Sequence, residues 1–142
     1  MPELGLATID TSVQETNRWL DALMSELGTD DKQYAYQTLR AVLTTLRDRL
    51  PLDQGAHFGA QLPLLIRGLY YEGFVPADVP KKYRRAQEWR QAIVKAGANI
   101  GDEQAGIASR AVFRVLDREL DAGLMSKIGE SLPDDIHAVV LH

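Results

Sequence analysis

Apolar side chains recur at helical spacing along most of the chain. Between residues 35 and 50 they are separated mainly by steps of three and four residues, which places them on one face of a helix. These residues are Ala35, Leu39, Val42, Leu43, Leu46 and Leu50. No stretch shows sustained alternation of apolar and polar residues bounded by turn residues, so we expect no strands. The pattern predicts an all-α protein.

The helical pattern repeats at an offset of about 70 residues. Sliding the sequence by 70 positions aligns Trp19 with Trp89 and Leu62-Pro63 with Leu132-Pro133. Within residues 12–72 this register gives 12 identities over 61 ungapped positions, where ordinary residue usage gives about 4 by chance. Most of the matched residues are apolar, with a glycine and a proline in the same order. The repeat therefore preserves the residue types that form a hydrophobic core and the turns between its helices.

Each copy of the repeat predicts four helices. In the first copy, Ser12 and Glu15 have the spacing of a capping box ahead of the first helix, and Gly28 is placed to end it. Pro51 closes the second helix, a short third helix covers residues 53–60, and a fourth begins at Leu62-Pro63.

The segment 73–80, GFVPADVP, contains two prolines and interrupts helix formation. We therefore expect a single helical domain, residues 1–142, with repeat 1 at 12–72, a linker at 73–80 and repeat 2 at 82–142. A four-helix unit of ~60 residues is marginally stable alone, so the two repeats are predicted to share one core.

The composition excludes several kinds of site. The 142 residues include no cysteine, which removes disulfides, thiolate catalysis, cysteine-ligated zinc and iron–sulfur clusters. None of the three histidines is followed by a carboxylate or a second histidine three or four residues later, so no metal is expected. Phosphate-binding loops and dinucleotide fingerprints are absent, and we expect no cofactor. The net charge of −4 disfavours unspecific binding to nucleic acid.

Neither end of the sequence carries a signal peptide or a lipidation motif. The most apolar run, residues 62–66, is far shorter than the ~20 residues that a membrane-spanning helix needs. We therefore expect no membrane association and a cytoplasmic location.

Three segments of the first repeat carry a recognisable signature: TNRWL at 16–20, LRAVLTTLRDRLP at 39–51 and GAQLPLLIRGLYYEGF at 59–74. Together they resemble the bacterial domain-of-unknown-function family 2267, and the resemblance covers nearly the whole chain. It implies a small, all-helical, cytosolic protein with no assigned activity.

The second repeat departs from this signature. Asp134, Asp135 and His137 stand where the first repeat has Leu64, Leu65 and Arg67. Whatever the signature does is therefore expected of the first repeat alone.

The first candidate binding surface consists of Arg67, Tyr70, Tyr71 and Glu72. Arg67 and Tyr71 are four residues apart and would share a helix face. That face could offer a guanidinium, a phenol and a carboxylate to an anionic or aromatic ligand. In the alternative interpretation Tyr70 belongs to the core, and Arg67 pairs with Glu72 or caps a neighbouring helix end.

The second candidate is a basic contact segment that follows the linker. Its members are Lys81, Lys82, Arg84, Arg85 and Arg90. Residues 81–100 carry six basic side chains and one acidic side chain. Such a run with an interleaved tyrosine can bind phosphates, but it is also typical of a solvated face or of a contact with an acidic partner.

These observations leave three hypotheses about function. The leading one is a non-catalytic binding or assembly module, with a protein partner still to be identified or with a second copy, because no convergent catalytic set is visible. The second is a small-ligand sensor or an enzyme with a pocket between the two repeats. The third is weak nucleic-acid binding through residues 81–95, which the net charge disfavours.

Overall fold

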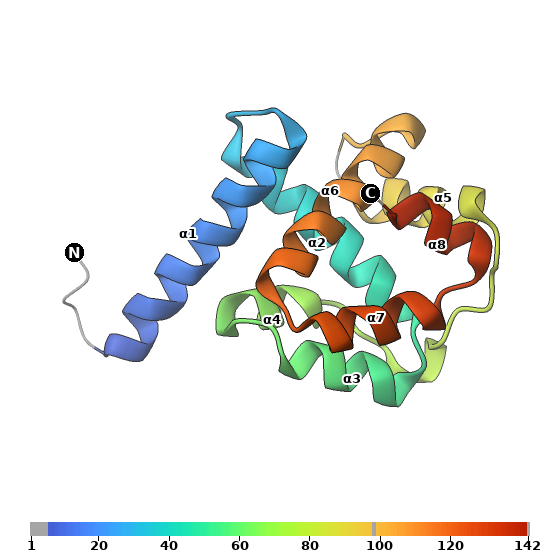
Figure 1. The fold of residues 1–142 in the computed structure, drawn as a ribbon, viewed down its shortest axis with the longest axis horizontal. Coiled ribbons are helices and arrows are strands. Elements are labelled where there is room, and N and C mark those ends of the chain that lie inside the picture. The colour runs from blue at the N-terminus through green and yellow to red at the C-terminus, as the bar shows by residue number, and fades with distance from the viewer. Residues whose placement is uncertain (1–5, 98, 142) are drawn as a thin grey trace.

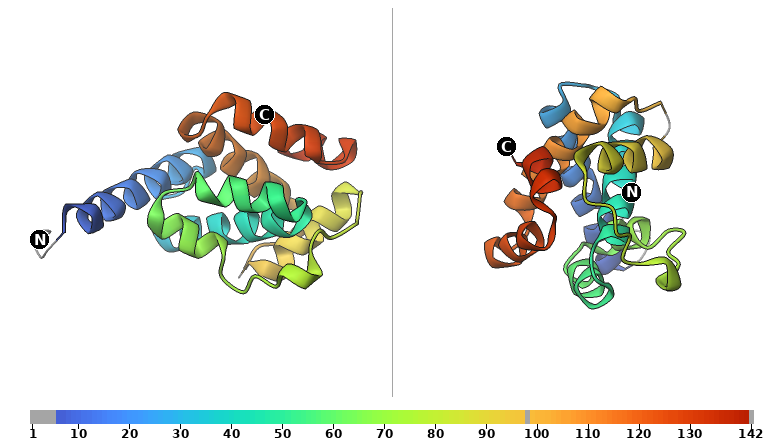
Figure 2. Two further views of the ribbon diagram at one scale, coloured as in Figure 1. Left: turned by 90° about the horizontal axis from the view of Figure 1, so that it is seen from below. Right: turned by 90° about the vertical axis from the view of Figure 1, so that its right-hand side faces the viewer.

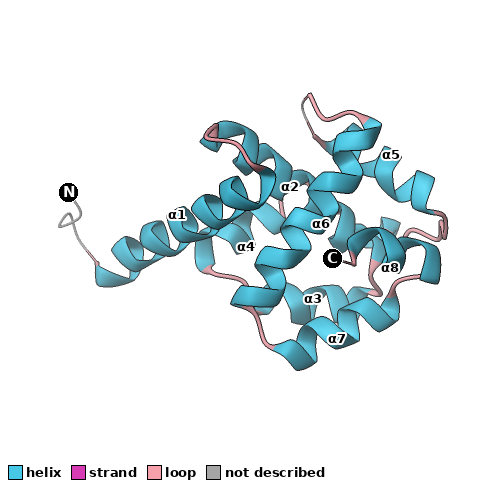
Figure 3. Cartoon of the chain, turned by 45° about the horizontal axis from the view of Figure 1, so that its top comes forward, coloured by secondary structure: helices cyan, strands magenta, loops and turns pink. Residues whose placement is uncertain are grey.

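The computed structural model describes residues 6–97 and 99–141. In these ranges the chain forms the helices α1 to α8 and a short 3-10 turn, with no strand (Figure 3). The all-α prediction is confirmed. The helices are α1 (Ala7–Leu27), α2 (Lys32–Arg49), α3 (Leu52–Ala60), α4 (Leu64–Tyr70), α5 (Ala86–Ala96), α6 (Asp102–Glu119), α7 (Ala122–Ser131) and α8 (Asp134–Val140), and the 3-10 turn is η2 (Pro76–Asp78).

The ends of the helices follow local chemistry. Gly28 ends α1 with a left-handed backbone, φ 70°, a conformation that costs glycine nothing, and its N–H returns to the last turn. The carboxylate of Asp31 accepts a hydrogen bond of 3.1 Å from the Tyr34 N–H and caps α2. Pro63 and Pro133 stand directly before α4 and α8.

The start of α1 differs from the expectation. The helix begins at Ala7, and Ser12 lies inside it, donating a 2.8 Å hydrogen bond to the Thr8 carbonyl. The Ser12 and Glu15 spacing therefore does not mark the beginning of α1. A serine hydroxyl that donates to the carbonyl one turn earlier in the same helix makes its own hydrogen bond but does not cap the N-terminus of that helix.

The two halves of the chain correspond in their helices. At an offset of 70 residues, the bounds of α2 and α4 coincide with those of α6 and α8. The packing corresponds as well, because α1 packs on α6 while α5 packs on α2, and α2 and α6 contact each other (Figures 1 and 2). Each first helix thus packs on the second helices of both halves. Internal duplication would produce this arrangement, and the duplication itself stays a prediction.

The hydrophobic core draws on both halves. It forms one cluster that includes Trp19 and Trp89, which are 1% and 0% exposed. Their ring nitrogens differ, however. Trp89 Nε1 donates a 2.8 Å hydrogen bond to Ser109 Oγ, whereas Trp19 Nε1 is buried without a partner among the described residues. Leu39 stands at the position that corresponds to Ser109, which explains the missing acceptor.

One helix is longer than its counterpart. At the same offset, Ala86 at the start of α5 corresponds to Thr16, so residues 7–15 of α1 have no helical equivalent. In Figures 1 and 2 this stretch projects beyond the other helices. In the part of the chain that the structure describes, no helix has the combined length and hydropathy of a transmembrane segment.

Replacing Ser109 with alanine tests the polar contact in the core. Ser109→Ala removes the acceptor of Trp89 Nε1 and leaves a buried donor unpaired, so we expect a loss of about 1–3 kcal/mol of unfolding free energy. Chemical denaturation measures the change. Ser126→Ala, at an exposed position on α7, is the control and should change little. Equal stability of the two variants would contradict the assignment.

Candidate binding sites

Tyr70 and Tyr71 lie at the end of α4. Tyr70 is fully buried, its hydroxyl donates a 2.7 Å hydrogen bond to the Gly55 carbonyl, and burial raises its pKa. Its ring meets Tyr71 edge-on at 5.0 Å between ring centres and packs against Phe58 at 5.5 Å. Tyr70 is therefore enclosed by the fold, and Tyr71 is half-buried beside it.

Arg67 and Glu72 point to different neighbours. Arg67 Nη2 donates to the carbonyls of Leu62 at 2.9 Å and Ala60 at 3.2 Å, which satisfies acceptors at the end of α3. Glu72 is exposed and forms an ion pair of 3.5 Å with Arg40 on α2. Three of the four predicted binding residues thus make packing or capping contacts, and their role in binding stays a prediction.

Arg47 organises this region, although the sequence analysis did not single it out. It is 6% exposed, and its Nη1 donates to the carbonyls of Tyr70 at 2.9 Å and Glu72 at 2.7 Å. Its Nε also pairs with Asp48 at 2.7 Å, and its guanidinium lies 5.2 Å from the centre of the Phe74 ring. Arg47 therefore fixes the chain that leaves α4.

A different surface of α4 is open. Leu64 and Leu65 are about half exposed, and so are three apolar side chains at the start of α1. We call this set the α1–α4 apolar surface, and its members, each 47–68% exposed, are Leu6, Ile9, Val13, Leu64 and Leu65. Between the two helices lies a groove of about 260 Å³, which Thr16, Leu20 and Leu65 help to line. On α1 the groove is lined by Thr16 and Leu20, which follow the exposed Val13 along the helix.

The basic contact segment lies in the loop before α5 and in its first turns. Lys81, Lys82, Arg84 and Arg85 are exposed, and Arg90 on α5 pairs with Asp102 at 3.3 Å. The backbone of this loop is held in place, because the Lys81 N–H donates to the Asp48 carbonyl at 2.7 Å and the Ala86 N–H donates to Asp135 at 2.6 Å.

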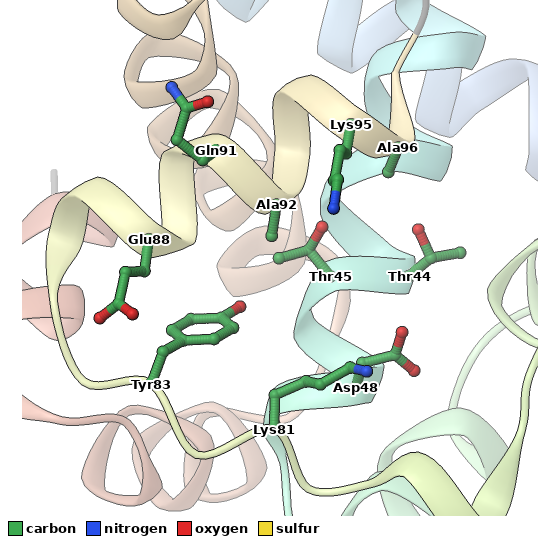
Figure 4. A pocket seen from close by; sticks show the side chains of 10 residues that line it. All are labelled: Thr44, Thr45, Asp48, Lys81, Tyr83, Glu88, Gln91, Ala92, Lys95 and Ala96. Atoms are coloured by element: carbon green, nitrogen blue, oxygen red, sulfur yellow. The ribbon is translucent and has the colours of Figure 1, made fainter.

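A pocket of about 630 Å³ opens between α2, α5 and this loop (Figure 4). We call it the α2–α5 pocket. Its wall on α2 is polar, its wall on α5 combines alanines with charged side chains, and its floor includes the Tyr83 ring. The lining residues are Thr44, Thr45, Asp48, Lys81, Tyr83, Glu88, Gln91, Ala92, Lys95 and Ala96. The pocket thus combines both halves of the chain, which matches the place named in the second hypothesis.

Arg49 holds Tyr83 at the floor of the pocket. Arg49 Nε donates a 2.8 Å hydrogen bond to the Tyr83 carbonyl, and its guanidinium lies 5.7 Å from the centre of the tyrosine ring. Burial raises the pKa of the Tyr83 hydroxyl, so this group remains neutral and can donate a hydrogen bond near neutral pH. No sequence pattern indicated this arrangement, because Arg49 and Tyr83 are brought together only by the fold.

The sequence belongs to a known family. It matches the family described as an uncharacterised conserved protein, DUF2267, over residues 16–139. The chain is a member of the DUF2267 family. The comparison with curated proteins gave no match.

The signature segments can now be placed in this DUF2267 chain. Residues 39–51 run along α2 and supply both buried arginines, Arg47 and Arg49, together with the polar wall of the α2–α5 pocket. Residues 59–74 run from the end of α3 through α4 and supply Leu64 and Leu65. The signature therefore contributes both to the pocket and to the α1–α4 apolar surface.

No metal-binding cluster involves the described histidines of this DUF2267 chain, His57 and His137. Between residues 6 and 141, leaving out 98, no group of three His, Cys, Asp or Glu side chains is placed to hold a metal ion. His57 lines a shallow hollow between α3 and α7, where Gln54 donates a 3.2 Å hydrogen bond to the Lys127 carbonyl. This contact joins the third helices of the two halves.

Replacing Arg47 tests its structural role. Arg47→Met keeps the aliphatic stem but leaves the Tyr70 and Glu72 carbonyls and the Asp48 carboxylate without their donor. We expect the unfolding free energy to fall by about 2–4 kcal/mol, measured by chemical denaturation. Arg84→Met, which changes an exposed arginine in the same way, should have little effect. If both variants were equally stable, Arg47 would not fix the end of α4.

Proposed function

We propose that this protein is a binding module that pairs with a second copy of itself through the α1–α4 apolar surface. The observation that carries the proposal is the extension of α1, which has no counterpart in the other half and presents exposed apolar side chains beside an apolar groove. The exposed apolar side chains lie on α1 and α4, two helices that contact each other, and exposed apolar surface on a globular protein often marks an interaction site.

The spacing on α1 supports a helical partner. Leu6, Ile9, Val13, Thr16 and Leu20 follow one another at steps of three, four, three and four residues. This is the pattern of the positions that form the seam between two supercoiled helices. A second copy offers the same exposed positions, Leu6, Ile9 and Val13, whereas Leu20 is buried in the chain's own core. The first turns of two α1 helices can therefore pack against each other around a two-fold axis, the commonest symmetry of soluble dimers.

The charges around the surface disfavour a membrane as the occupant. Helices that lie on anionic membranes carry lysines and arginines beside their apolar face. Residues 7–17 of α1 contain Asp10 and Glu15 and no basic side chain, and Glu72 lies beside the groove. A protein surface is therefore the better match.

The energies predict a weak dimer. Full burial of one large aliphatic side chain contributes about 1.5–3 kcal/mol, so ten half-exposed side chains across two copies contribute roughly 10 kcal/mol. Association costs about 4–15 kcal/mol in lost motion. The two terms are similar in size, so the dimer should depend on protein concentration.

Charge substitutions on α1 test the proposal. The double variant Ile9→Glu and Val13→Glu places carboxylates in the apolar stripe, and we expect it to remain monomeric at concentrations where the unmodified chain dimerises. Analytical ultracentrifugation over a concentration series measures the fractions of monomer and dimer for the variant and for the unmodified chain.

The control places the same two charges elsewhere on α1. Thr11→Glu with Gln14→Glu changes exposed positions that helical geometry turns away from the stripe, and it should dimerise like the unmodified chain. A chain that stays monomeric throughout the series, or a control that dissociates equally, would refute pairing through this surface.

A second candidate function, a small-ligand sensor, is supported by the α2–α5 pocket. Its volume of about 630 Å³ lies within the range of pockets that hold small molecules, about 300–1,000 Å³. Nucleic-acid binding through residues 81–95 has less support, because Arg90 is engaged with Asp102. A gel shift that weakens steeply with added salt would be needed to sustain it.

A further inference from the structure

The charged groups that line the α2–α5 pocket differ in whether they are already paired. Asp48 is neutralised by Arg47, whose Nε and Nη2 lie 2.7 and 3.1 Å from its two carboxylate oxygens. Glu88 accepts a 3.3 Å hydrogen bond from the Arg85 N–H at the start of α5. Both acidic side chains of the pocket therefore serve the fold.

The two lysines of the pocket are not engaged in this way. Across residues 6–97 and 99–141, neither the Lys81 nor the Lys95 ammonium has a hydrogen-bond or ion-pair partner. They come from opposite sides of the pocket, and in Figure 4 the Lys95 side chain reaches from α5 toward Thr45 on α2. Within the part of the chain that the structure describes, the pocket therefore holds two cations that have no protein partner and could bind a ligand.

Neutral donors also line the pocket. They are the Thr45 and Tyr83 hydroxyls, and burial raises the pKa of the Tyr83 hydroxyl above its ordinary value. Ala92 and Ala96 leave apolar space for a small carbon skeleton. Ammonium groups with hydroxyl donors provide the charge-assisted hydrogen bonds that carboxylate and phosphate oxygens accept.

We infer that the α2–α5 pocket binds a small organic anion that carries a carboxylate or a phosphate group, held between Lys81 and Lys95. This inference rests on the second candidate function and is independent of self-association. Lys82 and Arg84 are exposed neighbours of Lys81 and Tyr83 that do not line the pocket, so they serve as references for the lysines that do.

An NMR titration of the ¹⁵N-labelled chain tests the inference at constant ionic strength. The anionic probes are inorganic phosphate and succinate, which distinguish the two head groups, and the controls are 1,4-butanediol and 1,4-diaminobutane. We expect saturable shifts of the Thr45, Tyr83 and Ala92 amide signals with at least one anion.

Matched variants locate the binding groups. Lys95→Gln and Lys81→Gln should each weaken the anion by about tenfold, because each removes one charge-assisted contact. Lys82→Gln removes the same charge from a neighbouring exposed residue that does not line the pocket, and it should leave the affinity nearly unchanged. Ala92→Leu fills the pocket and should abolish the shifts while the chain remains folded.

The remaining outcomes decide against the inference in distinguishable ways. Saturable shifts with butanediol or diaminobutane, but with neither anion, would overturn the anion class and keep the pocket as a ligand site. The absence of saturable shifts with every probe would overturn both. Equal weakening by Lys82→Gln and Lys95→Gln would show diffuse attraction by the basic segment rather than a site.

Discussion

The structure depends on how the first helix of each half packs against the second helices of both halves. α1 packs on α2 of its own half and on α6 of the other, and α5 packs on α6 of its own half and on α2 of the other. An amphipathic helix is stable in water only where its apolar face is covered. Both halves therefore contribute to one core, which agrees with the presence of Trp19 and Trp89 in one cluster. The α2–α5 pocket is a consequence of the same packing, because it opens where a helix of one half meets a helix of the other.

The halves share a scaffold but differ in the residues that surround it. Arg47, which holds the end of α4, corresponds to Asp117 in the second half, and Arg49 corresponds to Glu119. The extension of α1 also has no equivalent. The apolar groove, the arginine that fixes α4 and the polar wall of the pocket are thus supplied by the first half. This agrees with the departure of the second half from the family signature.

The sequence predicted the helices well because their signals are local. Apolar spacing and the prolines at 51, 63 and 133 place the ends of α2, α4 and α8 closely, and Gly28 ends α1 as expected. The repeated glycine at 59 and 129 also has a local meaning. A Cβ at Gly59 would lie 2.7 Å from the Tyr70 ring, and one at Gly129 would lie 3.0 Å from His137 Nε2, so each glycine lets the third helix approach the fourth.

The sites were harder to predict because they depend on which faces remain uncovered. Arg67 and Tyr70 have the composition of a binding site, yet the fold uses them to cap α3 and fill the core. Leu64 and Leu65 belong to the most apolar run of the sequence, yet they are half exposed. The steps of three and four residues from Leu6 to Leu20 were visible, but they do not say whether the chain itself covers that face. No sequence pattern pointed to Thr45, because it lines a pocket only where α5 packs against α2.

Arg40 connects the two candidate sites physically. Its side chain pairs with Glu72, which lines the groove of the α1–α4 apolar surface, and donates a 3.3 Å hydrogen bond to the Ala96 carbonyl at the end of α5. Ala96 lines the α2–α5 pocket, and so does Thr44, whose hydroxyl donates to the Arg40 carbonyl at 2.8 Å. A ligand that moved the end of α5 would therefore act on the contacts of Glu72. If that displacement changed the affinity of the apolar surface for its partner, the partner would change the affinity of the pocket by the same factor, because coupling between two binding sites is reciprocal.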